Sequence, residues 1–135
     1  LHRVDRRQRQ MCIRDSPTVA GGAAAAREWM QRRTSAVIAH NDLMAMGFMI
    51  AVKSVGIEVP RDVSVVGTDN IFMSALFTPA LTTVTTSRNT QGKLAFNQLL
   101  EQLRHQHRDT GHLTTSIAMK LVERDSTAQV PSLHR

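Results

Sequence analysis

Hydrophobic and polar positions in this chain change their spacing from one stretch to the next, and this change marks the predicted elements. Apolar runs rich in β-branched residues predict strands at residues 36–39, 63–66, 81–85 and 116–122. Stretches with helical spacing predict helices at residues 23–33, 42–55 and 90–105. Alternating helices and strands are typical of an α/β fold with right-handed crossovers and a mostly parallel sheet.

Two strand-to-helix junctions deliver polar side chains to one place in such a fold. The strand before Asn41 and the strand before Asp69 both end in small or acidic groups. Ligands of open α/β sheets bind outside the carboxyl ends of the strands, so Asn41 and Asp69 are candidate ligand contacts. Gly67 is expected to let the chain turn sharply before Asp69. Asn41 is equally suited to cap the helix, and Asp42 to complement the helix dipole.

The predicted helix 42–55 is apolar around nearly its whole circumference, with Lys53 as a rare polar position. A helix of this kind is buried on both sides. We therefore expect a second surface over its outer side, and the residues predicted to form a subunit contact are Met46, Met49, Leu76 and Phe77. The alternative is burial beneath loops of the same chain.

The composition fits one modest domain and gives no sign of direct nucleic-acid binding. The chain has 135 residues, is 41% hydrophobic and carries a formal net charge of +6. Residues 1–16 are rich in Arg and Gln and hold half of that charge, so the remainder is only mildly basic. We expect residues 1–16 to be a non-native or disordered basic leader, residues 17–128 a partial binding domain, and residues 129–135 a disordered tail.

Signatures of catalysis, metal binding and membrane insertion are not found in the sequence. It contains no glycine-rich nucleotide loop, no nucleophile elbow and no zinc-protease motif. Cys12 is a lone cysteine, and the histidines at 105, 107 and 112 fit a solvated loop better than a metal site. No apolar run approaches the roughly 20 residues that span a bilayer. We expect a non-enzymatic cytoplasmic protein without cofactor or metal.

Four segments in order carry a resemblance to a known family. They are residues 34–47 (TSAVIAHNDLMAMG), 56–69 (GIEVPRDVSVVGTD), 79–84 (PALTTV) and 121–127 (LVERDST). Together they resemble the C-terminal part of the effector domain of LacI/GalR transcription regulators. The resemblance implies a periplasmic-binding-protein-like fold, three-layer αβα, of which this chain would supply mainly the C-terminal lobe. It also implies a homodimer that meets operator DNA only through a headpiece outside this chain.

The same resemblance assigns roles to single residues. It implies that Asn41 and Asp69 contact a small-molecule effector, a sugar or another metabolite, bound between two lobes. Thr86 and Arg88 fall where the chain crosses between lobes and are further candidate contacts. Many relatives carry two acids where this chain has Asp69 followed by Asn70. The alternative function is a periplasmic sugar-binding subunit of a transport system, which shares the lobes but is usually monomeric.

Overall fold

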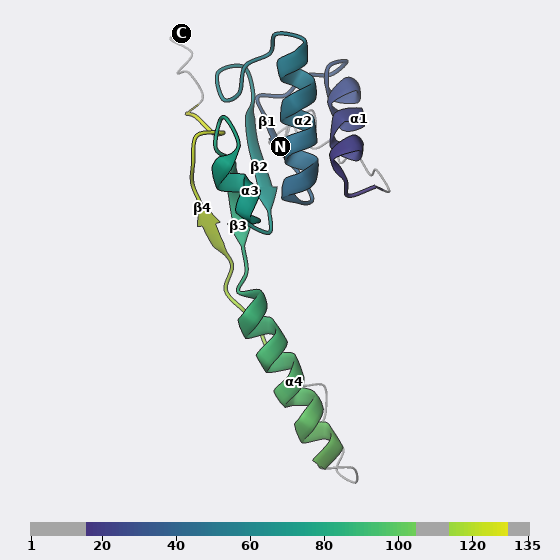
Figure 1. Cartoon of the computed structure of the whole chain (residues 1–135), viewed down its shortest axis with the longest axis vertical. Coiled ribbons are helices and arrows are strands. Elements are labelled where there is room, and N and C mark those ends of the chain that lie inside the picture. Colours follow the sequence, from purple (N-terminus) through teal and green to yellow (C-terminus); the bar gives the residue numbers. More distant parts are fainter. Residues whose placement is uncertain (1–15, 105–113, 130–135) are drawn as a thin grey trace, which may run out of the picture. The chain divides into compact units, whose positions relative to one another are not determined.

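The computed structural model describes residues 16–104 and 114–129, and the predicted leader and tail lie almost wholly outside these ranges. The chain divides into two compact units, one formed by residues 1–84 and 121–135 and the other by Thr85–Lys120. Helices and strands follow in the order α1 (Val19–Trp29), β1 (Ala36–Ile38), α2 (Asp42–Ser54), β2 (Ser64–Thr68), α3 (Phe72–Leu76), β3 (Thr82–Thr85), α4 (Arg88–Arg104) and β4 (Lys120–Val122) (Figure 1).

The strands form one sheet in the order β1-β2-β3-β4. β1 runs parallel to β2, with Val37 opposite Val65, and β2 runs parallel to β3, with Val66 opposite Thr82. The predicted α/β fold with a mostly parallel sheet is therefore confirmed. The last strand is shorter than predicted, since β4 takes only the end of the stretch 116–122.

Helix α1 begins four residues before its predicted start and includes Gly21 and Gly22. Thr18 caps the helix by accepting a hydrogen bond from the Gly21 amide. A Cβ at Gly22 would lie 2.0 Å from the Met44 carbonyl oxygen, and one at Gly47 would lie 1.9 Å from that of Val19. Gly22 and Gly47 thus let the backbones of α1 and α2 approach directly, an arrangement that larger side chains would prevent.

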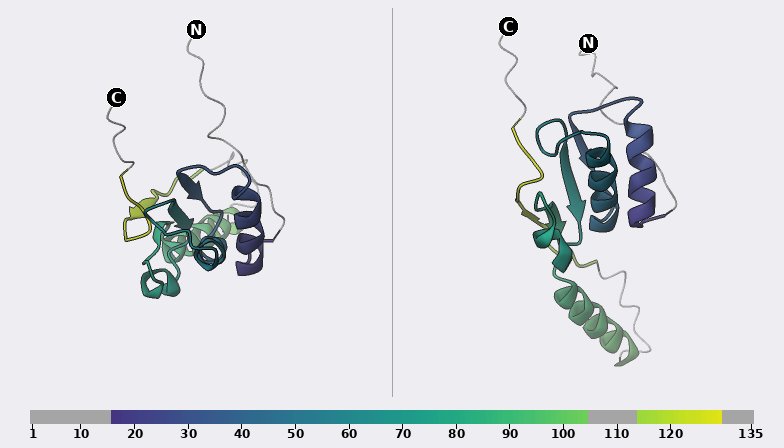
Figure 2. Two further views of the ribbon diagram at one scale, coloured as in Figure 1. Left: turned by 90° about the horizontal axis from the view of Figure 1, so that it is seen from above. Right: turned by 45° about the horizontal axis from the view of Figure 1, so that its top comes forward.

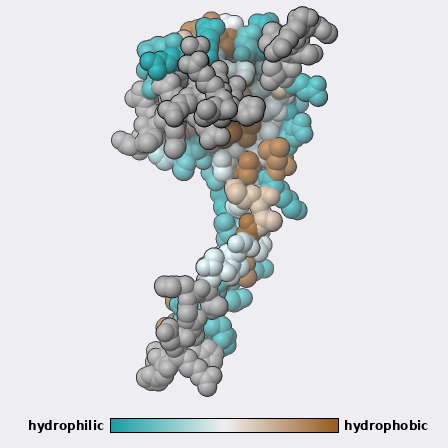
Figure 3. Space-filling view, turned by 180° about the vertical axis from the view of Figure 1, so that it is seen from behind, coloured by the Kyte–Doolittle hydropathy of each residue, from teal (hydrophilic) through white to brown (hydrophobic). Residues whose placement is uncertain are grey.

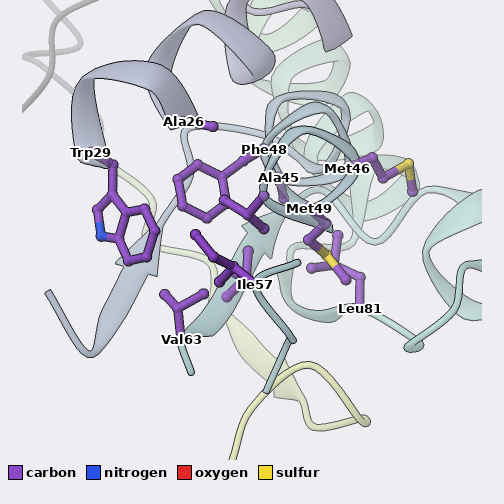
Figure 4. Packing of buried hydrophobic residues seen from close by; sticks show 11 residues of the cluster. Ala26, Trp29, Ala45, Met46, Phe48, Met49, Ile57, Val63 and Leu81 are labelled. Carbon is purple, nitrogen blue, oxygen red and sulfur yellow. The ribbon is translucent and has the colours of Figure 1, made fainter. Parts of the chain in front are cut away.

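The hydrophobic core lies between these two helices and one face of the sheet. Trp29 and Phe48 meet edge to face with ring centroids 5.3 Å apart, and the close-up shows Met49 beside Leu81 (Figure 4). Met46 and Met49 are each only 2% exposed. Burial within this chain, with α1 as part of the cover, therefore explains only part of the apolar character of α2, because Leu43 and Ile50 are 38% and 51% exposed. The two methionines themselves lie in the core and not on the surface.

Helices pack on one face of the sheet in the described part of this unit. By the strand register, Val65 and Gly67 point toward α2, and Figure 2 shows α1 and α2 side by side. Ile38 lies on the opposite face and is 79% exposed. Two layers of the predicted three-layer arrangement are thus present here, and the described residues of this unit add no helix over Ile38.

A C-terminal strap, residues 123–129, holds β2 and the start of β3 together. The Val65 amide donates to the Ser126 carbonyl at 2.8 Å, and the Ser126 hydroxyl donates to the Val65 carbonyl at 2.6 Å. The same hydroxyl accepts from the Thr82 amide at 2.8 Å, and Ser126 is fully buried. The strap therefore satisfies backbone groups of both strands where the pairing of β2 with β3 begins.

The second unit consists mainly of α4. Its first turn is capped by Ser87, whose hydroxyl accepts from the Thr90 amide at 3.2 Å. Phe96, Leu99 and Leu103 are exposed, and on the face shown in Figure 3 the helical stretch presents small brown areas among teal and pale residues. Among the residues that the structure describes, no helix is both long and apolar enough to cross a membrane.

Candidate ligand-binding edge of the sheet

Asn41 lies where β1 gives way to α2, and its side chain caps the helix. Its backbone is extended, with φ −146°, and its Oδ1 accepts a hydrogen bond from the Met44 amide at 2.9 Å. Its Nδ2 donates to the Pro17 carbonyl at 2.9 Å. The capping role considered from the sequence is thus confirmed, and both ends of the amide already have a partner within this chain.

Asp69 follows β2 directly and has an unusual backbone. Its φ is 106°, in the left-handed region that non-glycine residues rarely adopt, and its side chain is exposed. Its backbone amide donates to the Val84 carbonyl at 2.8 Å. No hydrogen bond or ion pair of its carboxylate is found among residues 16–104 and 114–129. Backbone conformations of this kind collect at ligand sites, where the surroundings hold them in place.

These two predicted contacts lie at the same edge of the sheet. The Ala39 amide donates to the Val66 carbonyl at 2.8 Å, so the carboxyl ends of β1 and β2 are neighbours. Asn41 comes two residues after Ala39, and Asp69 three residues after Val66. Of the two, only Asp69 keeps its polar side-chain atoms free for a further partner in the described structure.

Asp42 is a buried carboxylate beneath this edge. The sequence suggested for it only an interaction with the dipole of α2, and the structure shows a larger role. Asp42 is only 1% exposed, and the hydroxyl of Thr83 donates to its Oδ1 at 2.6 Å. The Ile71 amide donates to Oδ2 at 2.9 Å, and the Ser74 hydroxyl donates to the same oxygen. One side chain thereby joins α2, β3 and α3. The fact that an acid follows the capping residue was the only sequence signal.

Gly67 leaves room for the Asp42 carboxylate and does not form a sharp turn. It lies within β2 and shows no positive φ, so the predicted turning role is wrong. A Cβ at this position would lie 2.2 Å from Oδ1 of Asp42 and 2.9 Å from a methyl carbon of Leu81. Glycine is required because the Asp42 carboxylate packs against the strand.

Arg124 is a second residue that sequence reasoning did not single out. Its Nη1 donates to the Leu81 carbonyl at 2.7 Å, and its Nη2 donates to Oδ1 of Asn70 at 2.7 Å. Its own amide donates to the Thr82 hydroxyl at 2.9 Å. The guanidinium thus connects the C-terminal strap to the residue just before β3 and to the residue that follows Asp69. Arg124 lies in the segment 121–127, which resembles LacI/GalR regulators, but nothing in that segment predicted these hydrogen bonds.

The remaining predicted contacts fall elsewhere. Thr86 is half-buried and Arg88 is exposed at the start of α4, and both belong to the second unit, which is described by itself. Leu76, at the end of α3, is 67% exposed, whereas Phe77 is half-buried and packs partly on the core. In the described ranges, no three His, Cys, Asp or Glu side chains are grouped as a metal site would require.

An open, mostly parallel sheet with an exposed acid at its carboxyl edge has the architecture of domains that bind ligands outside that edge. The sequence profile of the periplasmic-binding-protein-like domain matches residues 2–127. This range includes most of the predicted leader, whose boundary at residue 16 stays a prediction. The chain belongs to this family and, within it, to the effector-binding domains of LacI/GalR regulators.

Known relatives agree on the class. The HTH-type transcriptional repressor PurR of Edwardsiella ictaluri is 40% identical over 101 residues, which cover 75% of this chain and 29% of that protein. A LacI family regulator of Enterococcus faecalis, solved with bound ribose, is 29% identical with a TM-score of 0.75, over 84% of this chain and 42% of the other.

A third relative was solved in a larger assembly. The lac repressor dimer, bound to operator and to the anti-inducer ONPF, is 28% identical with a TM-score of 0.74. The match covers 83% of this chain and 39% of the repressor chain. This chain therefore spans well under half the length of these relatives. All three are transcription regulators, a finding that favours the regulator over the transport subunit.

Proposed function

We propose that this chain is the ligand-sensing part of a LacI-type transcription regulator, and that the Asp69 carboxylate binds hydroxyl groups of a small effector. The observation that carries the proposal is the placement of Asp69. It is an exposed acid without a partner in the described structure, held in a left-handed conformation at the carboxyl edge of a parallel sheet. A carboxylate can accept two hydrogen bonds at once, which suits the adjacent hydroxyls of a sugar.

The other predicted contacts have weaker support. Asn41 already caps α2 through Oδ1, so a ligand would have to share its amide or displace Pro17 from Nδ2. Thr86 and Arg88 rest on the resemblance alone. An arginine at position 88 would suit an anionic or hydroxyl-rich effector. The regulator of Enterococcus faecalis solved with ribose supports a sugar as the first ligand to examine.

The proposed mechanism is a shift between conformations. Effector that binds one arrangement of the two lobes more tightly increases its population, and a dimer passes this change to headpieces that contact operator DNA. Such a protein works in the cytoplasm beside the chromosome and performs no catalysis. The lac repressor dimer bound to operator supports this part of the proposal.

Dimerisation is proposed through the exposed end of α3. Met46 and Met49 are core residues, which leaves Leu76, with Phe77 beside it, as the predicted contact. Leu76→Glu in the full-length protein is expected to shift sedimentation from dimer toward monomer. Val55→Glu, at an exposed position after α2, is the matched control and should leave the dimer intact. Equal sedimentation of the wild type and Leu76→Glu would exclude this contact.

The experiment that tests the ligand site is a thermal-shift screen of the full-length protein with D-ribose and other monosaccharides. Asp69→Ala is expected to abolish the shift produced by the best sugar. Asp125→Ala is the matched control, since Asp125 is also exposed, and it should retain the shift. An undiminished shift in Asp69→Ala would contradict the proposed site.

A further inference from the structure

The turn after β2 has a conformation that its sequence alone does not favour. Asp69 and Asn70 are consecutive residues with positive φ, 106° and 49°, and neither is glycine. Asn tolerates the left-handed region better than most residues, whereas Asp69 lies far from its usual φ. A pair of this kind persists only where the surroundings fix it.

Fixed partners hold every backbone amide of this turn. The Asp69 amide donates to the Val84 carbonyl at 2.8 Å, and the Asn70 amide to the Thr83 hydroxyl at 3.3 Å. The Ile71 amide donates to Oδ2 of Asp42 at 2.9 Å. The Thr83 hydroxyl itself donates to Asp42, so the buried carboxylate supports two of the three amides, one directly and one through Thr83.

The Asn70 side chain of this turn is held by the C-terminal strap. Arg124 directs one guanidinium nitrogen to Oδ1 of Asn70 and the other to the Leu81 carbonyl, each at 2.7 Å. The planar fork of arginine fixes the separation of its two acceptors, which a lysine ammonium would not do. Arg124 therefore sets the distance between the turn and the start of β3.

We propose that Arg124 is a positioning residue for effector binding: it locks the Asp69–Asn70 turn so that the Asp69 carboxylate is presented in its binding orientation before ligand arrives. This proposal depends on the proposed function of Asp69. Preorganisation increases affinity because the ordering of the turn is completed before binding. Arg124 acts through Asn70 and needs no contact with the ligand.

Three variants of the full-length protein separate the effect of the Arg124–Asn70 hydrogen bond from that of the backbone conformation of the turn. Arg124→Met removes the guanidinium. Asn70→Gly keeps positive φ free of strain and removes only the side chain that Arg124 holds. Asn70→Asp keeps an oxygen acceptor for Arg124 and serves as the rescuing variant. Arg61→Met, at an exposed arginine outside this turn, is the matched control.

The first measurement is amide hydrogen exchange at residues 69–71, which needs no ligand. We expect exchange about tenfold faster in Arg124→Met and Asn70→Gly, and wild-type rates in Asn70→Asp and Arg61→Met. The Ala39 amide, bonded to β2, should keep its rate in all four. Unchanged exchange in both Arg124→Met and Asn70→Gly would overturn the proposal, as would equal acceleration at Ala39, because that indicates general loss of stability.

The second measurement is the affinity for D-ribose, or for whichever monosaccharide the screen shows to bind better. We expect about tenfold weaker binding in Arg124→Met and Asn70→Gly, and near wild-type binding in Asn70→Asp. Faster exchange with unchanged affinity would overturn the positioning role. If the wild type binds no monosaccharide, the proposal of a sugar effector fails, and the exchange experiment still decides whether Arg124 locks the turn.

Discussion

The Thr83 hydroxyl donates a hydrogen bond of 2.6 Å to Oδ1 of Asp42, which ties the middle of β3 to the first turn of α2. Oδ2 of the same carboxylate accepts from the Ile71 amide and the Ser74 hydroxyl. The side chain is buried, yet none of these groups lacks a partner. The candidate ligand edge therefore rests on a polar cluster inside the protein, and the first predictions concern this cluster.

Asp42→Ala is expected to lower the free energy of unfolding by about 2–5 kcal/mol, because three donors would lose their acceptor in a buried site. Asp42→Asn should also destabilise, since its amide group turns a donor toward other donors. Urea denaturation of the full-length protein measures both. Asp125→Asn, at an exposed acid, should change stability by less than about 0.5 kcal/mol, and equal effects at the two positions would contradict this account.

Gly67→Ala is expected to destabilise the protein by about 1–3 kcal/mol, since the added methyl group would overlap Oδ1 of Asp42. Gly92→Ala is the opposite control: nothing lies within 4 Å of a Cβ there, and the residue is inside α4. Alanine should stabilise that helix by about 0.5–1 kcal/mol. Thermal unfolding should show a lower melting temperature for Gly67→Ala and a higher one for Gly92→Ala. An unchanged melting temperature in Gly67→Ala would count against the close packing of Gly67 and Asp42.

Asn41→Ala is expected to cost about 1 kcal/mol of stability through loss of the α2 cap. Asn41→Ser should recover most of that loss, because a serine hydroxyl also caps, while it removes the donor to Pro17. Denaturation curves for the pair measure the cap, and sugar affinity measured on Asn41→Ser tests the ligand role without the stability change. Stability of Asn41→Ala equal to the wild type would show that the cap contributes little.

Asp62 lies in an exposed turn and is predicted to titrate below the ordinary range of an aspartate. The side-chain hydrogen bonds from Arg61 lower its pKa most, and the bond from the Glu58 amide lowers it further. The stabilisation linked to this lowered pKa is present above the unfolded pKa and is lost as pH falls through the folded one. Carboxyl NMR titration should show the pKa rise toward its ordinary value in Arg61→Gln. An unchanged titration curve would assign the shift to the backbone bond alone.

The strands and the two main helices of the first unit were predictable from the sequence, because buried parallel strands and apolar helices leave a clear pattern. The start of α1 was not, since Gly21 and Gly22 weaken an isolated helix, whereas in the fold Gly22 allows close packing against α2. Likewise, the apolar surface of α2 is the same whether another subunit or α1 covers it. Only the fold distinguishes these cases, and it places Met46 and Met49 in the core.

The candidate site was predictable only in part. Strand ends place Asn41 and Asp69 at a common edge, and the resemblance to LacI/GalR regulators points to the same residues. The turn at Asp69 is held at positive φ by hydrogen bonds to residues far away in the sequence, among them Asp42 and Arg124. The bond between Arg124 and Asn70 spans 54 residues, and no local pattern encodes it.

The most direct test of the central claim is a crystal structure of the full-length protein with the sugar that gives the largest thermal shift. The account predicts ligand hydroxyls within hydrogen-bonding distance of the Asp69 carboxylate, with Asp69 and Asn70 still at positive φ. A sugar bound at another place, with the Asp69 carboxylate remote from every ligand atom, would contradict it.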